Sequence, residues 1–188
     1  MNFSSTILAN HLHPARMGAE IEDQTVQLRP SLAPRCERTK KTILLADDDP
    51  GVREMMGRVL EAENYEVILA KNGNETASKF VDGEPDIVLL DLNMPERDGW
   101  SALRFMNAVH PRLPVIIITA RPNQYPQADD LGVDGLMEKP LNLPVLLEAI
   151  KVFLSETKDE RTRRLANPKF KTALLSQHMQ SPTNGGDR

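Results

Sequence analysis

The length and composition of the chain suit one folded domain with additional terminal segments. The sequence has 188 residues, of which 40% are hydrophobic and 27% are charged, as is typical of globular proteins. Its longest apolar runs, such as residues 115–118, are too short to span a bilayer, and residues 1–19 lack the apolar stretch of a secretory signal. The one cysteine, Cys36, cannot form an internal disulfide. We therefore expect a cytoplasmic protein with no membrane segment.

Charge is distributed unevenly along the chain. Residues 41–156 contain 11 Lys and Arg against 20 Asp and Glu, a net charge of −9. An acidic domain repels a polyphosphate backbone, which argues against nucleic-acid binding by the core. Residues 157–188 are polar and mildly basic, with 7 basic against 3 acidic side chains. Because this tail is too short for a separate DNA-binding domain, we expect none.

The two ends of the sequence show little hydrophobic periodicity. Residues 1–40 combine three prolines with Ser, Asn, Thr and charged side chains, and we expect a largely disordered leader. Residues 157–188 are expected to form a tail, with room for one or two weak amphipathic turns at Phe170, Leu174 and Leu175. The domain is thus predicted over residues 41–156.

Within residues 41–156, apolar runs alternate with helix patterns. The first strand is predicted at residues 42–46, followed by a helix that Asp49 can cap, with Pro50 at its first position. Further strands are predicted at residues 65–70, 87–90, 113–118 and 135–138, with helices at 75–81, 100–109 and from Asn142 to about residue 155. Pro122 and Pro126 allow at most a short, late helix between the fourth and fifth strands.

This alternation predicts a parallel sheet covered by helices on both faces. The expected fold is a doubly wound α/β domain with five strands in the flavodoxin-like order 2-1-3-4-5.

Polar side chains follow four of the predicted strands at their carboxyl ends. They are Asp47 and Asp48, Asp91, Thr119, and Lys139. Taken alone, Asp91 is equally consistent with an acid that merely ends a strand. Together, however, these residues should meet at one edge of the sheet, where open α/β sheets bind their ligands.

The residue types at this edge indicate phosphoryl chemistry. Clustered carboxylates repel one another unless a cation offsets them, and oxygen ligands select a hard ion such as Mg²⁺. One carboxylate would then remain available as a nucleophile. Lys139 would supply positive charge and Thr119 a hydroxyl donor for phosphoryl oxygens.

At these positions the sequence resembles the receiver domain of bacterial two-component response regulators, the family that includes the chemotaxis regulator. The resemblance covers residues 42 to about 155. It rests on the acidic run after the first strand and on the segments Asp91-Leu92-Asn93-Met94-Pro95, Asp98-Gly99, Thr119-Ala120 and Lys139-Pro140.

The resemblance implies specific roles for these residues. Asp91 would accept a phosphoryl group from a sensor histidine kinase or a histidine phosphotransfer protein. Asp48, Asp91 and the backbone carbonyl of Asn93 would bind Mg²⁺, with Asp47 acting mainly through water. Thr119 and Lys139 would contact the phosphoryl group, and the Lys139-Pro140 bond would be cis. Such a domain takes part in its own phosphoryl transfer without being a classical enzyme.

Two departures from the family pattern bear on output. An aromatic residue usually stands three positions before the lysine, but this sequence has Leu136. The fourth helix is also interrupted by Pro122 and Pro126. We therefore expect the surface that is often used for partner contacts to differ.

Two functions remain open from the sequence. The first is a stand-alone phosphoacceptor that signals through protein contacts. The second is a receiver-like interaction module that works independently of phosphorylation, which Leu136 and the altered fourth helix suggest. The complete set of acidic, threonine and lysine positions favours the first. A small hydrolase has little support, because the sequence lacks a G-x-S-x-G motif.

Overall fold

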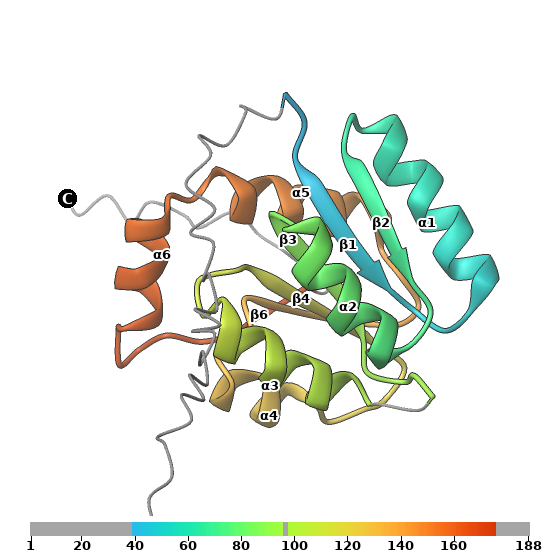
Figure 1. Ribbon diagram of the computed structural model, residues 1–188. Helices are drawn as coiled ribbons and strands as arrows, with labels where there is room; N and C mark the ends of the chain where they lie inside the picture. Colours follow the sequence, from blue (N-terminus) through green and yellow to red (C-terminus); the bar gives the residue numbers. More distant parts are fainter. Residues whose placement is uncertain (1–38, 96–97, 176–188) are drawn as a thin grey trace, which may run out of the picture. The chain divides into compact units, whose positions relative to one another are not determined.

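Six parallel strands form one sheet in this computed structural model, which describes residues 39–95 and 98–175. The expected leader, apart from its last two residues, lies outside the described part of the chain. The strand order is β2-β1-β3-β4-β5-β6 (Figure 1), which confirms the predicted five-strand order and adds one strand. The strands are β1 (Thr42–Ala46), β2 (Glu66–Ala70), β3 (Ile87–Asp91), β4 (Val115–Thr119), β5 (Gly135–Glu138) and β6 (Ala173–Leu174).

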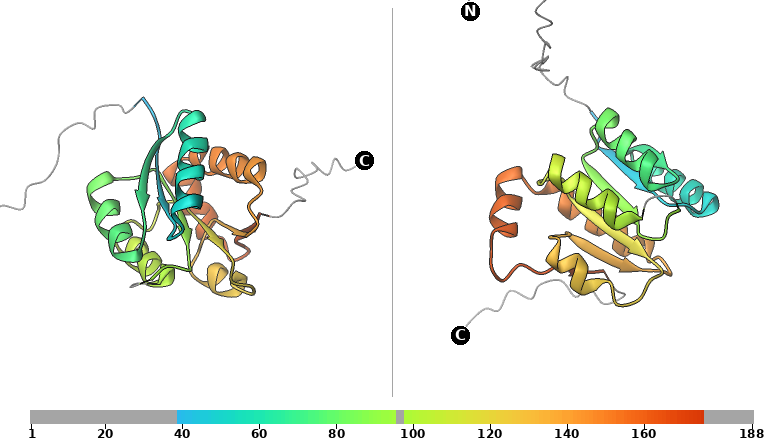
Figure 2. Two further views of the ribbon diagram at one scale, coloured as in Figure 1. Left: turned by 90° about the vertical axis from the view of Figure 1, so that its right-hand side faces the viewer. Right: turned by 60° about the horizontal axis from the view of Figure 1, so that its bottom comes forward.

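Helices cover both faces of the sheet, as the strand patterns predict. They are α1 (Pro50–Ala62), α2 (Gly73–Gly83), α3 (Gly99–Val109), α4 (Tyr125–Asp130), α5 (Leu143–Ser155) and α6 (Lys158–Leu165). The apolar residues of α2, α3 and α4 pack on one face, and those of α1 and α5 on the other. The left view of Figure 2 shows α2 and α5 on opposite sides of the strands. β1, β3 and β4 are buried along their whole length, as expected of strands covered on both faces.

Local sequence signals set the helix starts. Asp49 caps α1 by accepting hydrogen bonds from the backbone N–H groups of Gly51 and Val52, and Asn142 caps α5, as predicted. Helix α4 has only six residues, which confirms the expected effect of the two prolines. None of the helices in the described ranges is long and apolar enough to cross a membrane.

The segment after residue 156 corrects the sequence-based boundary. Instead of a polar tail, residues 158–165 form α6 and residues 173–174 form β6, parallel to β5. Thr157 and Glu160 make a capping box at the start of α6. The helix was missed because it is polar on almost every face, so hydrophobic periodicity could not reveal it. The folded domain therefore continues to Leu175, which is buried.

A buried ion pair joins α6 to the amino ends of β4 and β5. Asp134, which precedes β5, is almost fully buried and is paired with Arg161 and Arg164 of α6. Asp134 also accepts a hydrogen bond from the backbone N–H of Val115 at 2.8 Å, and Arg161 donates to the carbonyl of Leu113 at 2.7 Å. These contacts satisfy polar groups that would otherwise be buried without partners.

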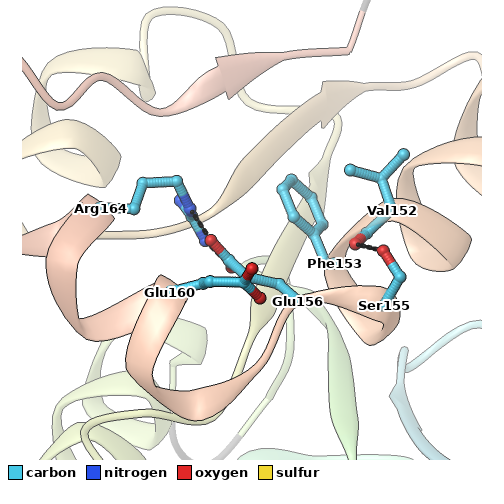
Figure 3. A pocket seen from close by; sticks show the side chains of 6 residues that line it. All are labelled: Val152, Phe153, Ser155, Glu156, Glu160 and Arg164. Atoms are coloured by element: carbon cyan, nitrogen blue, oxygen red, sulfur yellow. Dashed lines mark hydrogen bonds and ion pairs between the residues drawn. The ribbon is translucent and has the colours of Figure 1, made fainter.

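Arg164 extends the attachment of α6 to the end of α5. Its guanidinium group forms a bidentate ion pair with Glu156 and lies over the rings of Phe153 and Phe170, at 5.6 and 5.4 Å from their centroids. Figure 3 shows Arg164 and Glu156 reaching toward each other beside a hollow between α5 and α6. Because α5 begins near the carboxyl ends of the strands and runs away from them, this hollow is distant from the predicted site.

We expect Arg161→Ala to lower the free energy of unfolding by about 3 kcal/mol, because it removes one partner of a buried carboxylate. Urea unfolding measures this change. The matched control is Arg163→Ala, which truncates an exposed arginine of the same helix and should change stability by less than about 0.5 kcal/mol. Equal losses of unfolding free energy in the two variants would show that the ion pair with Asp134 stabilises the fold no more than an exposed arginine does.

Candidate functional site

Three carboxylates meet at the carboxyl ends of β1 and β3. These strands are neighbours, with Ala46 in register with Leu90, so Asp47 and Asp91 follow at the same level of the sheet. One carboxylate oxygen from each of Asp47, Asp48 and Asp91 lies within 4.8 Å of the others. Asp47 and Asp91 are buried, whereas Asp48 is exposed. The parallel sheet thus brings together the three acids that the sequence singled out.

Backbone amides fix the orientation of the two buried carboxylates. Asp47 Oδ1 accepts a hydrogen bond from the N–H of Asp49 at 2.9 Å, and Asp91 Oδ1 accepts one from the N–H of Asn93 at 2.8 Å. Both are i to i+2 turns that aspartate forms readily at strand ends. In each carboxylate the other oxygen, Oδ2, faces a side chain.

That side chain is Lys139, which follows β5. Its Nζ lies 2.9 Å from Asp47 Oδ2 and 2.6 Å from Asp91 Oδ2. One ammonium group therefore bridges the ends of three strands. The Lys139-Pro140 bond is cis, as the family resemblance implies.

Burial and hydrogen bonds shift the pKa values of Asp47 and Lys139. Burial raises the pKa of Asp47 above its usual value, against the opposing hydrogen bonds from Lys139 and from the N–H of Asp49. Burial by itself lowers the pKa of Lys139, but hydrogen bonds to Asp91 and Asp47 outweigh it and leave this pKa raised. Lys139 is therefore a firmly charged group that offsets the negative charge of the carboxylates.

Thr119 ends β4 at the same edge of the sheet. It is fully buried, and its carbonyl accepts a hydrogen bond from the N–H of Lys139 at 2.8 Å. Its Oγ1 accepts a hydrogen bond from the N–H of Arg121 at 3.0 Å. The structure thus places Thr119 next to Lys139 at the carboxyl edge of the sheet, and the Thr119 hydroxyl accepts a hydrogen bond from its own loop.

Two arginines that the sequence analysis missed complete the surroundings. Arg53 of α1 donates to the backbone carbonyls of Asp47 and Asp48, at 2.7 and 3.2 Å. Arg121 donates through Nε to the side-chain carbonyl of Asn93 at 2.7 Å. Their positions in the sequence could have identified both. Arg53 lies one turn into the first predicted helix, and Arg121 lies just after the strand-ending Thr119.

Gly99 allows the backbone around Asp91 to pack closely. A Cβ atom at this position would lie 2.5 Å from the carbonyl oxygen of Asp91 and 2.7 Å from Leu92 Cα, which is closer than atoms can approach. The preceding residue, Asp98, caps α3 by accepting from the N–H of Ser101. The Asp98-Gly99 pair therefore starts a helix directly against the strand that carries Asp91.

The sequence model of the response regulator receiver domain matches residues 43–151. This chain belongs to the response regulator receiver family. The match covers the whole carboxylate cluster together with Thr119 and Lys139, and it confirms the resemblance on which the sequence-based roles depend.

Curated relatives of this receiver domain are response regulators. Response regulator RR06 of Streptococcus pneumoniae serotype 2 is 37% identical over 114 residues, which cover 60% of this chain and 52% of the relative. Response regulator MprA of Mycobacterium avium is 32% identical over 148 residues, which cover 78% of this chain and 65% of the relative. The matched region thus spans about half to two thirds of these relatives. The expected stand-alone action of this receiver stays a prediction.

Solved structures agree with the fold and with the kind of site. A CheY-like receiver domain protein from Methanospirillum hungatei is 28% identical with a TM-score of 0.60, and it aligns over 66% of this chain and 98% of its own. The receiver domain of sensor histidine kinase PA1611 from Pseudomonas aeruginosa is 25% identical with a TM-score of 0.57, over 62% and 99% of the two chains. That structure has a magnesium ion coordinated in its active-site cleft.

We expect Lys139→Met to lower the free energy of unfolding at pH 7, in the absence of divalent ions, by about 2 kcal/mol, because two buried carboxylates lose their shared cation. The loss of the lowering hydrogen bond from Lys139 should raise the pKa of Asp47 further above its usual value, so the folded state of the variant takes up protons more readily than its unfolded state. The stability of the variant should therefore fall as pH rises. Its loss of unfolding free energy relative to the unchanged protein should be small below about pH 4 and complete at neutral pH.

Urea unfolding across this pH range tests the expectation. Lys151→Met is the control, because Lys151 pairs with Glu63 on the surface and should contribute little at any pH. A deficit in Lys139→Met that is independent of pH would contradict the electrostatic explanation.

Proposed function

We propose that this receiver domain accepts a phosphoryl group on Asp91, with Mg²⁺, from a phosphohistidine of a sensor histidine kinase or a histidine phosphotransfer protein. The observation that carries the proposal is the bridge from Lys139 Nζ to Asp47 Oδ2 and Asp91 Oδ2 within the three-carboxylate cluster. A lysine held between two buried acids provides a fixed positive charge where a phosphoryl group on Asp91 would add negative charge.

The proposed transfer is a displacement at phosphorus. A carboxylate oxygen of Asp91 attacks the phosphorus, an O–P bond forms, and the N–P bond of phosphohistidine breaks. Its electron pair returns to the imidazole nitrogen of the donor. Water later attacks the phosphorus and releases inorganic phosphate, with the Asp91 carboxylate as the leaving group. The domain therefore turns over its own phosphoryl group and stores a signal in between.

The residues present fit a magnesium ion. The carboxylates of Asp47, Asp48 and Asp91 offer only oxygen ligands within a span of 4.8 Å, which suits a hard cation. Asp48, Asp91 and the backbone carbonyl of Asn93 would hold the ion, with Asp47 acting through water. Bound there, Mg²⁺ would neutralise charge on the phosphoryl oxygens and the carboxylates. This assignment is supported by the exposure of Asp48, which leaves the cluster open to solvent on one side.

Lys139 and Thr119 would then contact the phosphoryl group. Lys139 is already bonded to Asp91 and keeps its charge at physiological pH because its pKa is raised. The Thr119 hydroxyl accepts a bond from Arg121 N–H, which leaves its own hydrogen available to donate to a phosphoryl oxygen. Both groups come from rigid strand ends, which favours a fixed arrangement.

The proposed output is a change in protein contacts of this domain. A specific observation favours the alternative function, an interaction module that works independently of phosphorylation. Leu136 is fully buried and lies in register with Leu174 of β6, and it stands where the family usually has an aromatic residue. A phosphorylation-independent interaction module would retain the site without using it, and the following experiment separates the two functions.

We expect the protein to form one phosphoryl adduct when it is incubated with a small acyl-phosphate donor and Mg²⁺, as measured by intact mass at low pH. Asp91→Asn should form none, because it removes the nucleophile. Asp49→Asn is the matched control: it changes the acid that caps α1 to another good capping residue and should still form the adduct. Absence of an adduct on the unchanged protein would rule out the phosphoacceptor function and favour the constitutive module.

We expect Mg²⁺ to stabilise the fold by about 2.7 kcal/mol at one hundred times its dissociation constant, because it binds only the folded state. Urea unfolding with and without Mg²⁺ measures this linkage without any phosphoryl donor. Asp48→Asn should lose most of the effect, whereas Asp49→Asn should retain it. Equal stabilisation of all three proteins would place the cation elsewhere.

A further inference from the structure

The last described residues, Lys171–Leu175, form a strap along the edge of the sheet. The N–H groups of Ala173 and Leu175 donate to the carbonyls of Asp134 and Leu136, at 3.0 and 2.8 Å. The Leu175 side chain is buried in the core beneath α5. The strap therefore covers the edge of β5, the strand that leads directly to Lys139.

The strap is also bonded to α4. Tyr125, the first residue of α4, donates its hydroxyl to the carbonyl of Thr172 at 2.9 Å. Asp129 accepts from the N–H of Thr172 at 2.8 Å and pairs with Lys171 at 2.6 Å. Thr172 is buried, and its hydroxyl donates to the carbonyl of Val133 at 2.8 Å. Thr172 thus ties α4 to the edge of the sheet.

The residues that lead into α4 connect this helix with the carboxylate site. Asn93 binds Asp91 through its N–H and Arg121 through its side chain, and Arg121 N–H binds Thr119. Only residues 122–124 separate Arg121 from Tyr125. The indole N–H of Trp100 donates to Gln124 at 3.3 Å, so these residues are anchored to α3 as well. Two sets of hydrogen bonds, one around Asp91 and one around Thr172, are therefore joined by the short covalent segment of residues 122–124.

We infer that the strap is a phosphorylation-sensitive latch, a regulatory device that rests on the proposed function of Asp91. A phosphoryl group on Asp91 draws the Arg121 guanidinium and the Thr119 hydroxyl toward its oxygens, because a guanidinium binds an anionic phosphoryl oxygen more strongly than the neutral side-chain oxygen of Asn93. The segment from Arg121 to Tyr125 then moves, and α4 moves with it. The bonds from Tyr125 and Asp129 to Thr172 fit only the present position of α4, so the strap is released.

Hydrogen exchange of the full chain, read by mass spectrometry on peptides that cover residues 171–175, tests the latch. The protein is treated with a small acyl-phosphate donor and Mg²⁺, and intact mass of the same sample reports the phosphoryl adduct. We expect the strap amides to exchange at least tenfold faster in the phosphorylated protein and at an unchanged rate in Asp91→Asn.

The exchange rate and the intact mass together distinguish a failure of the latch from a failure of the proposed function. Unchanged exchange in a sample that carries the adduct would overturn the latch and leave phosphorylation of Asp91 intact. Equal acceleration in Asp91→Asn would also overturn it. A sample without an adduct would overturn the proposed function and the latch with it.

Tyr125→Phe tests the latch from the other direction. It removes the hydroxyl bonded to Thr172, and we expect strap exchange to become about fivefold faster without any donor, the factor expected from one ordinary hydrogen bond. Because linkage is reciprocal, the phosphorylated fraction at limiting donor should rise. Tyr65→Phe is the matched control, since Tyr65 precedes β2 and does not contact the strap. A Tyr125→Phe protein with a loosened strap but an unchanged phosphorylated fraction would overturn the coupling.

Discussion

The bridge made by Lys139 between Asp47 and Asp91 is the interaction on which the rest of the site depends. It joins residues from the ends of three strands, and it works only because β1, β3 and β5 run parallel and finish at the same edge. The carboxylates are buried and close together, so without a cation their mutual repulsion would oppose folding. The same electrostatic demand makes the site suited to its proposed chemistry. A cluster that needs positive charge in the folded state suits the Mg²⁺ of the proposed function, and Lys139 supplies positive charge beside the proposed phosphoryl position.

A second buried ion pair performs a structural task at the opposite end of the strands. Asp134 stands at the amino end of β5, and Lys139 follows its carboxyl end, so this short strand connects both charged centres. Arg161 brings α6 onto the domain, and the chain then returns as β6 along β5. The extension consequently occupies the sheet edge and contacts α4, on the side of the domain where the sequence departs from the family pattern. The short helix α4 and the added segment are therefore parts of one arrangement.

The sequence was sufficient for the five-strand core because its signals are local. Continuous apolar runs marked the buried strands, Asp49 and Asn142 marked helix starts, and Pro122 and Pro126 correctly predicted a short α4. The boundary at residue 156 was wrong for a different reason. Helix α6 is polar on nearly all sides and is held by an arginine that pairs with an acid 27 residues earlier in the chain. Such a pairing has no local signature, and strand β6, with two residues, is too short to show alternation.

The residues of the site divide in the same way. The sequence by itself determined which groups stand at the strand ends, because a strand that stops on Asp91, Thr119 or Lys139 is visible as an apolar run followed by a polar residue. Tertiary structure alone decided that one ammonium bridges two carboxylates, that Arg121 binds Asn93 and that Gly99 must lack a side chain beside Asp91. These facts depend on distances of a few ångströms between segments remote in sequence. Only the packing of the folded chain sets such distances.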